Sequence, residues 1–429
     1  MSATAGASPG ASRLNRVLTL WPLILYGLGV IVGAGIYVAL GAVMRRAGEA
    51  APLSFLLAGV TAALTGLCYA ELAGRFPEAS GGVAYVRHGF GSERLAQATG
   101  VATMLVVAVS AASIASGTTQ YLIVLMKWPV PLLMTLMIGA FTAIAIAGVG
   151  ASVGLAGAIG ALEIGGLIVA IAAGFWAAPD FDMRGMIPST ALGWGGMAAG
   201  AFIAFFAFIG FETLANMGEE VVDAQRTLPR GILGAVGISI VLYVLVVTAV
   251  VLSDRAGANP LVALFGGKTA AGFAIVGALA VGNGVLVQIV MLSRLLYGMA
   301  NRRELPRVLA WVHPRLRTPV PATLLAGGAI LAVTVLVPFE HLLALSNAIT
   351  LTLFALVDLA LWRLRRMEPP PARGASAQGR PTQGRPTQGT LAHGTPAQGT
   401  PALGFRAPGW VPPLAAASCL VLLACEVLF

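Results

Sequence analysis

Long apolar stretches separated by short polar segments run along most of the chain. Each stretch reaches the roughly 17–25 residues that a helix needs to cross the hydrocarbon core of a membrane. Helices are expected because an unpaired backbone N–H or C=O group finds no water partner in lipid. The pattern predicts an all-α integral membrane protein of about 11 transmembrane helices, at residues 17–41, 50–73, 95–122, 129–148, 152–177, 194–216, 231–253, 270–298, 320–338, 341–362 and 408–428.

The basic residues indicate how these helices are oriented. If the N-terminus is cytoplasmic, 20 of the 26 lysines and arginines fall at the cytoplasmic side, which is a strong positive-inside bias. The outer segments then hold only Arg45, Arg46, Lys127, Arg184, Arg255 and Lys268. We therefore expect a multi-pass protein of the cell inner (cytoplasmic) membrane, with lipid around it. The net charge of +9 is explained by this orientation and does not indicate a nucleic-acid partner.

Composition narrows the class of function. The chain is 58% hydrophobic and 10% charged, whereas about a quarter of a soluble domain is charged, so a soluble protein is excluded. The 3 cysteines and 4 histidines have no metal-ligand spacing. The sequence contains no phosphate-cradling loop, nucleophile elbow or paired catalytic carboxylates. We therefore expect no metal, no cofactor and no enzymatic activity, and a driving force from an ion gradient or exchange.

The predicted spans form two successive blocks of five helices, residues 17–177 and 194–362. Because five is an odd number, the second block enters the membrane from the opposite side, which makes an inverted repeat. Residues 1–16 form a cytoplasmic tail, and residues 408–429 form an eleventh helix. Between them, residues 363–407 are rich in Pro, Gly, Thr and Gln and repeat the pentad Gly-Arg-Pro-Thr-Gln. Such a tract cannot bury a core, so a disordered linker is expected.

Glycines interrupt the first helix of each block. Span one contains Gly29, Gly33 and Gly35, and span six reads Phe-Phe-Ala-Phe-Ile-Gly-Phe-Glu at 205–212. Glycine inside a helix costs up to about 1 kcal/mol relative to alanine, which favours unwinding, although close helix packing is the alternative. Breaks at equivalent places in inverted halves indicate a midplane binding site. Freed N–H groups attract a carboxylate, and freed carbonyls attract an ammonium group or a cation.

Further motifs follow these breaks in a characteristic order. Gly-Ala-Gly-Ile-Tyr at 33–37 is followed by Glu-Leu-Ala-Gly-Arg-Phe-Pro at 71–77. After span six come Gln-Arg-Thr-Leu-Pro-Arg-Gly at 225–231 and Ser-Arg-Leu-Leu-Tyr-Gly-Met-Ala at 293–300. Together these motifs resemble the amino acid–polyamine–organocation (APC) transporter superfamily, in its amino acid permease branch.

The resemblance implies a leucine-transporter-like fold, which is a five-plus-five inverted repeat with helices 1 and 6 broken. It also implies an amino acid substrate that is moved by alternating access. The carbonyls of Phe206, Ala207 and Ile209 would receive the substrate α-ammonium, and Phe208 and Phe211 would shape the side-chain pocket or gate. The backbone that would hold the α-carboxylate comprises Ile31, Val32, Gly33, Ala34 and Gly35.

Glu163, Glu212 and Asp358 are carboxylates inside the predicted spans, where an ionisable group costs roughly 2.5–3.5 kcal/mol on insertion scales. Glu163 matches a position where one proton-coupled branch of the resembled superfamily has a lysine in place of a sodium ion. It is therefore a candidate proton carrier, or alternatively a hydrogen-bonded tie between spans five and one. Glu212 either titrates during transport or caps freed N–H groups. Asp358 is expected to pair with an arginine among Arg363, Arg365 and Arg366.

The predicted function is secondary active transport of amino acids, most simply by proton symport. An amino acid or amine exchanger and a polyamine carrier are alternatives of the same class, and a non-transporting amino acid sensor is an alternative of another class. A channel fits two inverted breaks less well. Near the cytoplasmic gate, Glu219 and Glu220 either face Arg226 or Arg230 or lie in a solvated loop. The substrate, the stoichiometry and the choice between monomer and homo-oligomer stay open.

Overall fold

The structure is a computed structural model that describes residues 18–77, 81–148, 153–178, 183–218, 220–255, 259–301, 303, 305–367 and 404–428. The predicted tail at 1–16, the repeats of the predicted linker, and Glu219 lie outside these residues. Within them the chain is helical, apart from turns and one isolated parallel bridge between Leu18 and Val221.

The described chain contains twelve helices of ten residues or more. They are α1 Leu20–Ala47, α2 Ala51–Arg75, α3 Gly81–Phe90, α4 Glu93–Leu125, α5 Val130–Ala147, α6 Val153–Ala177, α7 Ala191–Ala204, α9 Ala224–Leu252, α11 Gly267–Asn301, α12 Val320–Leu336, α13 Phe339–Met367 and α14 Val411–Leu428. Six shorter segments join them, namely η1 Gly48–Ala50, η2 Arg184–Met186, η3 Phe205–Phe208, α8 Glu212–Ala215, α10 Pro260–Ala263 and η4 Arg307–Ala310.

Nine stretches of the described chain are long and apolar enough to cross a membrane, which confirms an all-helical, multi-pass membrane protein. One of them, Leu20–Arg75, covers both α1 and α2, and α12 is a shorter apolar helix. Each of the eleven predicted spans therefore contains a helix. The connection between α2 and α4 holds the additional helix α3, which the apolar pattern did not predict because α3 is short and only half apolar.

The predicted break in span one is wrong in this structure, because α1 is a continuous helix of 28 residues. Its glycines instead allow other elements to approach closely. A Cβ atom added to Gly35 would lie 2.5 Å from the carbonyl oxygen of Ala207, and one added to Gly33 would lie 2.9 Å from Oε2 of Glu163. Small residues at helix interfaces serve this purpose in membranes. The close-packing alternative therefore explains the glycines of α1.

The predicted break in span six is confirmed. The helix α7 ends at Ala204, and the chain continues as η3 and a turn before α8 starts at Glu212. Gly210 in that turn has φ 127°, a conformation that side chains with a Cβ rarely adopt. A Cβ at Gly210 would also lie 2.9 Å from Cγ1 of Val30 on α1. Glycine is therefore required twice over at this turn, by the backbone conformation and by the space.

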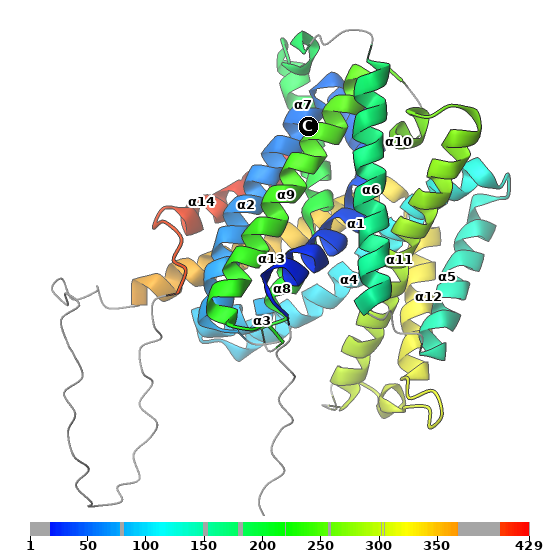
Figure 1. The fold of residues 1–429 in the computed structure, drawn as a ribbon. Coiled ribbons are helices and arrows are strands. Elements are labelled where there is room, and N and C mark those ends of the chain that lie inside the picture. Colours follow the sequence, from blue (N-terminus) through cyan, green and yellow to red (C-terminus); the bar gives the residue numbers. More distant parts are fainter. Residues whose placement is uncertain are drawn as a thin grey trace, which may run out of the picture.

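The broken span lies beside α1 in the middle of the helix assembly. In Figure 1, α14 lies beside α2 and α13, on the other side of the molecule from α5 and α12. Between these two sides, α1 contacts α6, α7, α9 and η3. Side chains from several helices can therefore meet at the contact between α1 and η3.

Candidate functional site

The candidate site is the contact between the glycine segment of α1 and the break in span six. At Gly35 the three nearest atoms to an added Cβ all belong to the backbone of Ala207, at 2.5, 2.7 and 2.9 Å. The two backbones therefore touch without a side chain between them. This contact brings together the two segments that the sequence predicts to hold the two ends of a zwitterion.

Tyr243 on α9 bridges these two segments. Its hydroxyl oxygen lies 2.8 Å from the carbonyl oxygen of Ile31 and 2.9 Å from that of Ala207. A tyrosine hydroxyl has a single proton, so it donates to one of these carbonyls at a time. One hydroxyl proton is therefore offered to two acceptors, and an ammonium group in the site would bring further donors.

Glu163 on α6 faces the same segment of α1. The residue is 2% exposed, and a Cβ added at Gly33 would lie 2.9 and 3.0 Å from its two carboxyl oxygens. Oε2 has no hydrogen-bond partner among the described residues. The backbone of Glu163 is held by Tyr37, whose hydroxyl donates to its carbonyl oxygen at 2.8 Å. A buried polar oxygen without a partner is costly, so this position is suited to receive a proton or a cation.

Glu212 lies at the end of the break and bonds to it directly. Its Oε2 accepts a hydrogen bond from the backbone N–H of Gly210 at 2.8 Å. The hydroxyl of Thr213 donates to the carbonyl oxygen of Gly210 at 2.6 Å. Both polar groups of the glycine are therefore satisfied by the first turn of α8. This geometry favours the capping alternative for Glu212.

The aromatic residues of the break are buried. Phe208 is 1% exposed and its ring centroid lies 5.1 Å from that of Tyr243 in an edge-to-face arrangement. Phe211 is fully buried and packs with centroid distances of 5.6 Å to Tyr69 and 5.1 Å to Phe354. The two predicted pocket residues therefore point into two different aromatic groups, one next to α9 and one next to α2 and α13.

The predicted ion pair of Asp358 with an arginine of α13 is wrong. The carboxyl group is buried, its Oδ2 accepts from Thr65 at 3.1 Å, and its Oδ1 has no partner among the described residues. Arg365 pairs with Glu71 on α2 instead. The reason is the match of helical rise between α2 and α13. Thr65 and Asp358 lie at one level, and Glu71 and Arg365 lie together further along both helices.

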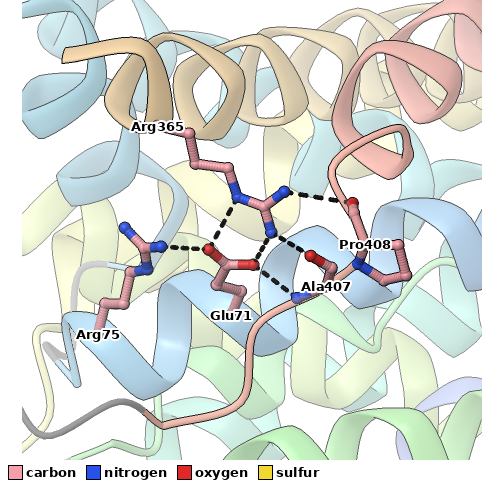
Figure 2. Close-up of polar contacts among 5 residues, drawn as sticks. All are labelled: Glu71, Arg75, Arg365, Ala407 and Pro408. Carbon is pink, nitrogen blue, oxygen red and sulfur yellow. Dashed lines mark hydrogen bonds and ion pairs between the residues drawn. The ribbon is translucent and has the colours of Figure 1, made fainter. Parts of the chain in front are cut away.

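Glu71 is the centre of a buried polar cluster that the sequence reasoning missed (Figure 2). Its Oε1 lies 2.5 Å from Arg75 and accepts from Nε of Arg365 at 3.0 Å. Its Oε2 accepts from the backbone N–H of Ala407 at 2.8 Å, and Arg365 donates to the carbonyl oxygens of Ala407 and Pro408 at 2.7 and 3.2 Å. The cluster joins α2 and α13 to the segment that precedes α14.

The tyrosines around α1 were also missed. Tyr121 on α4 donates to the carbonyl oxygen of Tyr37 at 2.8 Å, and Tyr243 donates one and a half turns earlier on α1. Tyrosines within an apolar span are the only signal that the sequence offers, and the pattern does not reveal which carbonyl each one reaches. Together with Tyr37, whose hydroxyl donates to Glu163 on α6, these tyrosines connect α1 to α4, α6 and α9.

Many apolar helices around an interrupted span are the architecture of a membrane transport protein. The sequence model of one family, described as Amino acid permease, matches residues 18–426. The chain therefore belongs to the amino acid permease family, within the APC superfamily to which its motifs point.

Individual relatives carry different names. The chain is 32% identical over 347 residues to "Cationic amino acid transporter 9, chloroplastic" of Arabidopsis thaliana, a match that covers 73% of this chain and 60% of that protein's length. It is 30% identical over 406 residues to "Methylthioribose transporter" of Bacillus subtilis, covering 85% of each chain. It is 29% identical over 393 residues to "Branched-chain amino acid permease BcaP" of the same species, covering 85% of this chain and 84% of that one.

Proposed function

We propose that this protein is a secondary active transporter that carries amino acids across the cytoplasmic membrane together with protons. The N-terminus lies in the cytoplasm, and the two blocks at 17–177 and 194–362 form an inverted repeat. Three features support the proposal: membership of a permease family, a broken sixth span and a buried residue, Glu163, whose carboxyl group lies against Gly33 of α1.

The substrate site that we propose lies between α1 and η3. The carbonyl of Ala207 shares the one proton of Tyr243 with a carbonyl of α1, and the substrate α-ammonium supplies a further donor to the Ala207 carbonyl. The α-carboxylate binds at Gly33 and Gly35. Because α1 is a continuous helix here, this step requires the helix to open locally at its glycines, where glycine already weakens it.

Glu163 is the proposed proton carrier, and its position is the observation that carries the proposal. The carboxyl group touches Gly33, the residue at which α1 would open, and one of its oxygens lacks a partner. Protonation of Glu163 and substrate binding at Gly33 therefore act on the same segment. Such a shared segment is what a symporter needs in order to couple the two events.

The name of one relative indicates a cationic substrate, another indicates branched-chain amino acids, and a third indicates methylthioribose. Glu212 is the acid nearest the break, and it already accepts a hydrogen bond from Gly210. A second positive charge on the substrate would have to share that carboxylate with the backbone of Gly210. This favours a zwitterionic amino acid over a dibasic amino acid or a polyamine.

The substrate is tested first by thermal unfolding of the purified protein with the twenty amino acids, common polyamines and methylthioribose at pH 5.5 and 7.5. A ligand that binds only the folded state raises its stability. We expect a zwitterionic amino acid to raise the unfolding temperature, more at pH 5.5. A rise with polyamines alone would contradict the amino acid assignment, and a rise with methylthioribose alone would do the same.

Coupling is tested with Glu163→Gln in proteoliposomes, using the amino acid found in that screen. We expect the variant to lose uptake driven by an inward proton gradient while it keeps exchange of labelled for unlabelled substrate. Glu340→Gln is the matched control, because the Glu340 side chain is 61% exposed and its ion-pair partner is Arg45 in the last turn of α1, outside the glycine segment. Gradient-driven uptake by Glu163→Gln at the wild-type rate would remove Glu163 from the mechanism.

A further inference from the structure

A cavity of about 350 Å³ lies between the first turns of α9 and the segment before α14. It is separate from the candidate substrate site, which lies further along α9 at Tyr243. Its lining combines two cations, one amide and several apolar groups, namely Arg226, Arg230, Gln225, Pro229, Leu233, Gly404 and Phe405.

The two arginines are four residues apart on α9, so their side chains lie on the same face of the helix. Both are exposed, and neither guanidinium forms a hydrogen bond or an ion pair with any residue that the structure describes. Of the two alternatives for Glu220, an ion pair with one of these arginines does not form in the described structure, and its backbone carbonyl accepts from Leu18 N–H at 3.1 Å. Two neighbouring guanidinium groups are thus available for an external anion.

The apolar part of the cavity lies beside and beyond these charges. Leu233 follows Arg230 by about one turn along α9, further from the cytoplasmic end, and Phe405 forms the facing wall. A ligand that fits has an anionic group at the membrane surface and an apolar part that reaches toward the hydrocarbon. This is the chemistry of an acidic phospholipid, and basic pockets at the cytoplasmic ends of membrane helices bind such headgroups.

The segment before α14 that lines the cavity is anchored at Ala407 by the cluster at Glu71 (Figure 2). Glu71 accepts from the backbone N–H of Ala407, and Arg365 donates to the carbonyl oxygen of the same residue. Phe405 is two residues before this anchor. The cavity is therefore preformed, and a ligand does not have to order the segment when it binds.

We propose that Arg226 and Arg230 bind the phosphate of an acidic phospholipid of the cytoplasmic leaflet, and that an acyl chain of this lipid packs against Leu233 and Phe405. The position is significant for the transporter because α9 begins directly after the turn that follows α8. That turn also pairs with the start of α1, where Val222 N–H donates to the carbonyl oxygen of Leu18 at 2.9 Å. The lipid would stabilise the end of the molecule at which the start of α1 meets the turn after α8.

The test measures thermal unfolding of the full chain, purified in a neutral detergent, with short-chain phosphatidylglycerol, short-chain phosphatidylcholine or inorganic phosphate added at equal phosphorus concentration. The test variant is Arg226→Gln/Arg230→Gln. The control variant is Arg307→Gln/Arg315→Gln, which removes the same charge from exposed cytoplasmic positions outside the cavity. All four side chains are exposed, so both variants are expected to fold, and elution as a single peak from a sizing column checks this.

We expect phosphatidylglycerol to raise the unfolding temperature of the wild type and the control variant in a saturable way. The Arg226→Gln/Arg230→Gln variant should lose most of this rise. Equal rises with phosphatidylcholine would overturn the proposal, as would an unreduced rise in the test variant or an equal reduction in both variants. A rise with inorganic phosphate as large as that with phosphatidylglycerol would assign the site to a free anion and refute the lipid. No step of this test uses a transported substrate, so its outcome is independent of the proposed transport.

Discussion

Replacement of Gly35 by alanine tests the contact between α1 and the break directly. The new Cβ would lie 2.5, 2.7 and 2.9 Å from three backbone atoms of Ala207. Real Cβ contacts are longer, and backbone atoms cannot turn away as a side chain can. α1 and η3 must therefore move apart, and overpacking of this kind costs about 1–3 kcal/mol. We expect the upper part of this range because all three clashes involve main chain.

Gly29→Ala is the matched control on the same helix. Its added Cβ would meet only the Cα of Gly160, at 3.6 Å, which is an ordinary van der Waals contact. Alanine is the better helix former by about 1 kcal/mol, so this variant should unfold at or slightly above the wild-type temperature. For both variants, thermal unfolding in detergent measures stability, and substrate exchange in proteoliposomes measures activity. Wild-type stability and exchange in Gly35→Ala would refute the close approach of these backbones.

Two further variants test polar contacts. Tyr243→Phe removes the donor shared by two buried carbonyls, so the free energy of unfolding should fall by about 1–3 kcal/mol. An unchanged unfolding temperature would show that the carbonyl of Ala207 has another donor. Glu71→Gln leaves Arg365, whose side chain is only 9% exposed, without its carboxylate and should cost about 3–5 kcal/mol, measured by thermal unfolding. Its control, Glu93→Gln, breaks an exposed ion pair worth roughly 0–1 kcal/mol, and equal losses in both variants would contradict the importance of burial.

The break in span six was predictable because it depends on local sequence. Gly210 allows a backbone conformation with positive φ that other residues resist. The acid that follows it, Glu212, is close enough along the chain to cap the turn. Neither feature needs a distant partner, and this is why a pattern in the sequence was sufficient.

The same reasoning failed for α1 because glycine has two roles in membrane helices. It weakens a helix, and it also lets another backbone come close. Which role applies to Gly33 and Gly35 depends on what faces them. In the fold, Gly35 faces Ala207 and Gly33 faces Glu163, and both partners lie more than a hundred residues away in the sequence.

The sequence by itself determined which segments are apolar helices, which side of the membrane each end of a helix is expected to face, and which family motifs the chain carries. These properties follow from the length of apolar runs and the position of charges, which are local and additive. Only the tertiary structure decided that Arg365 pairs with Glu71 and not with the nearer Asp358. It also decided that Tyr243 reaches two carbonyls at once. Such contacts depend on the level and rotation at which packed helices meet, and a linear pattern does not contain that information.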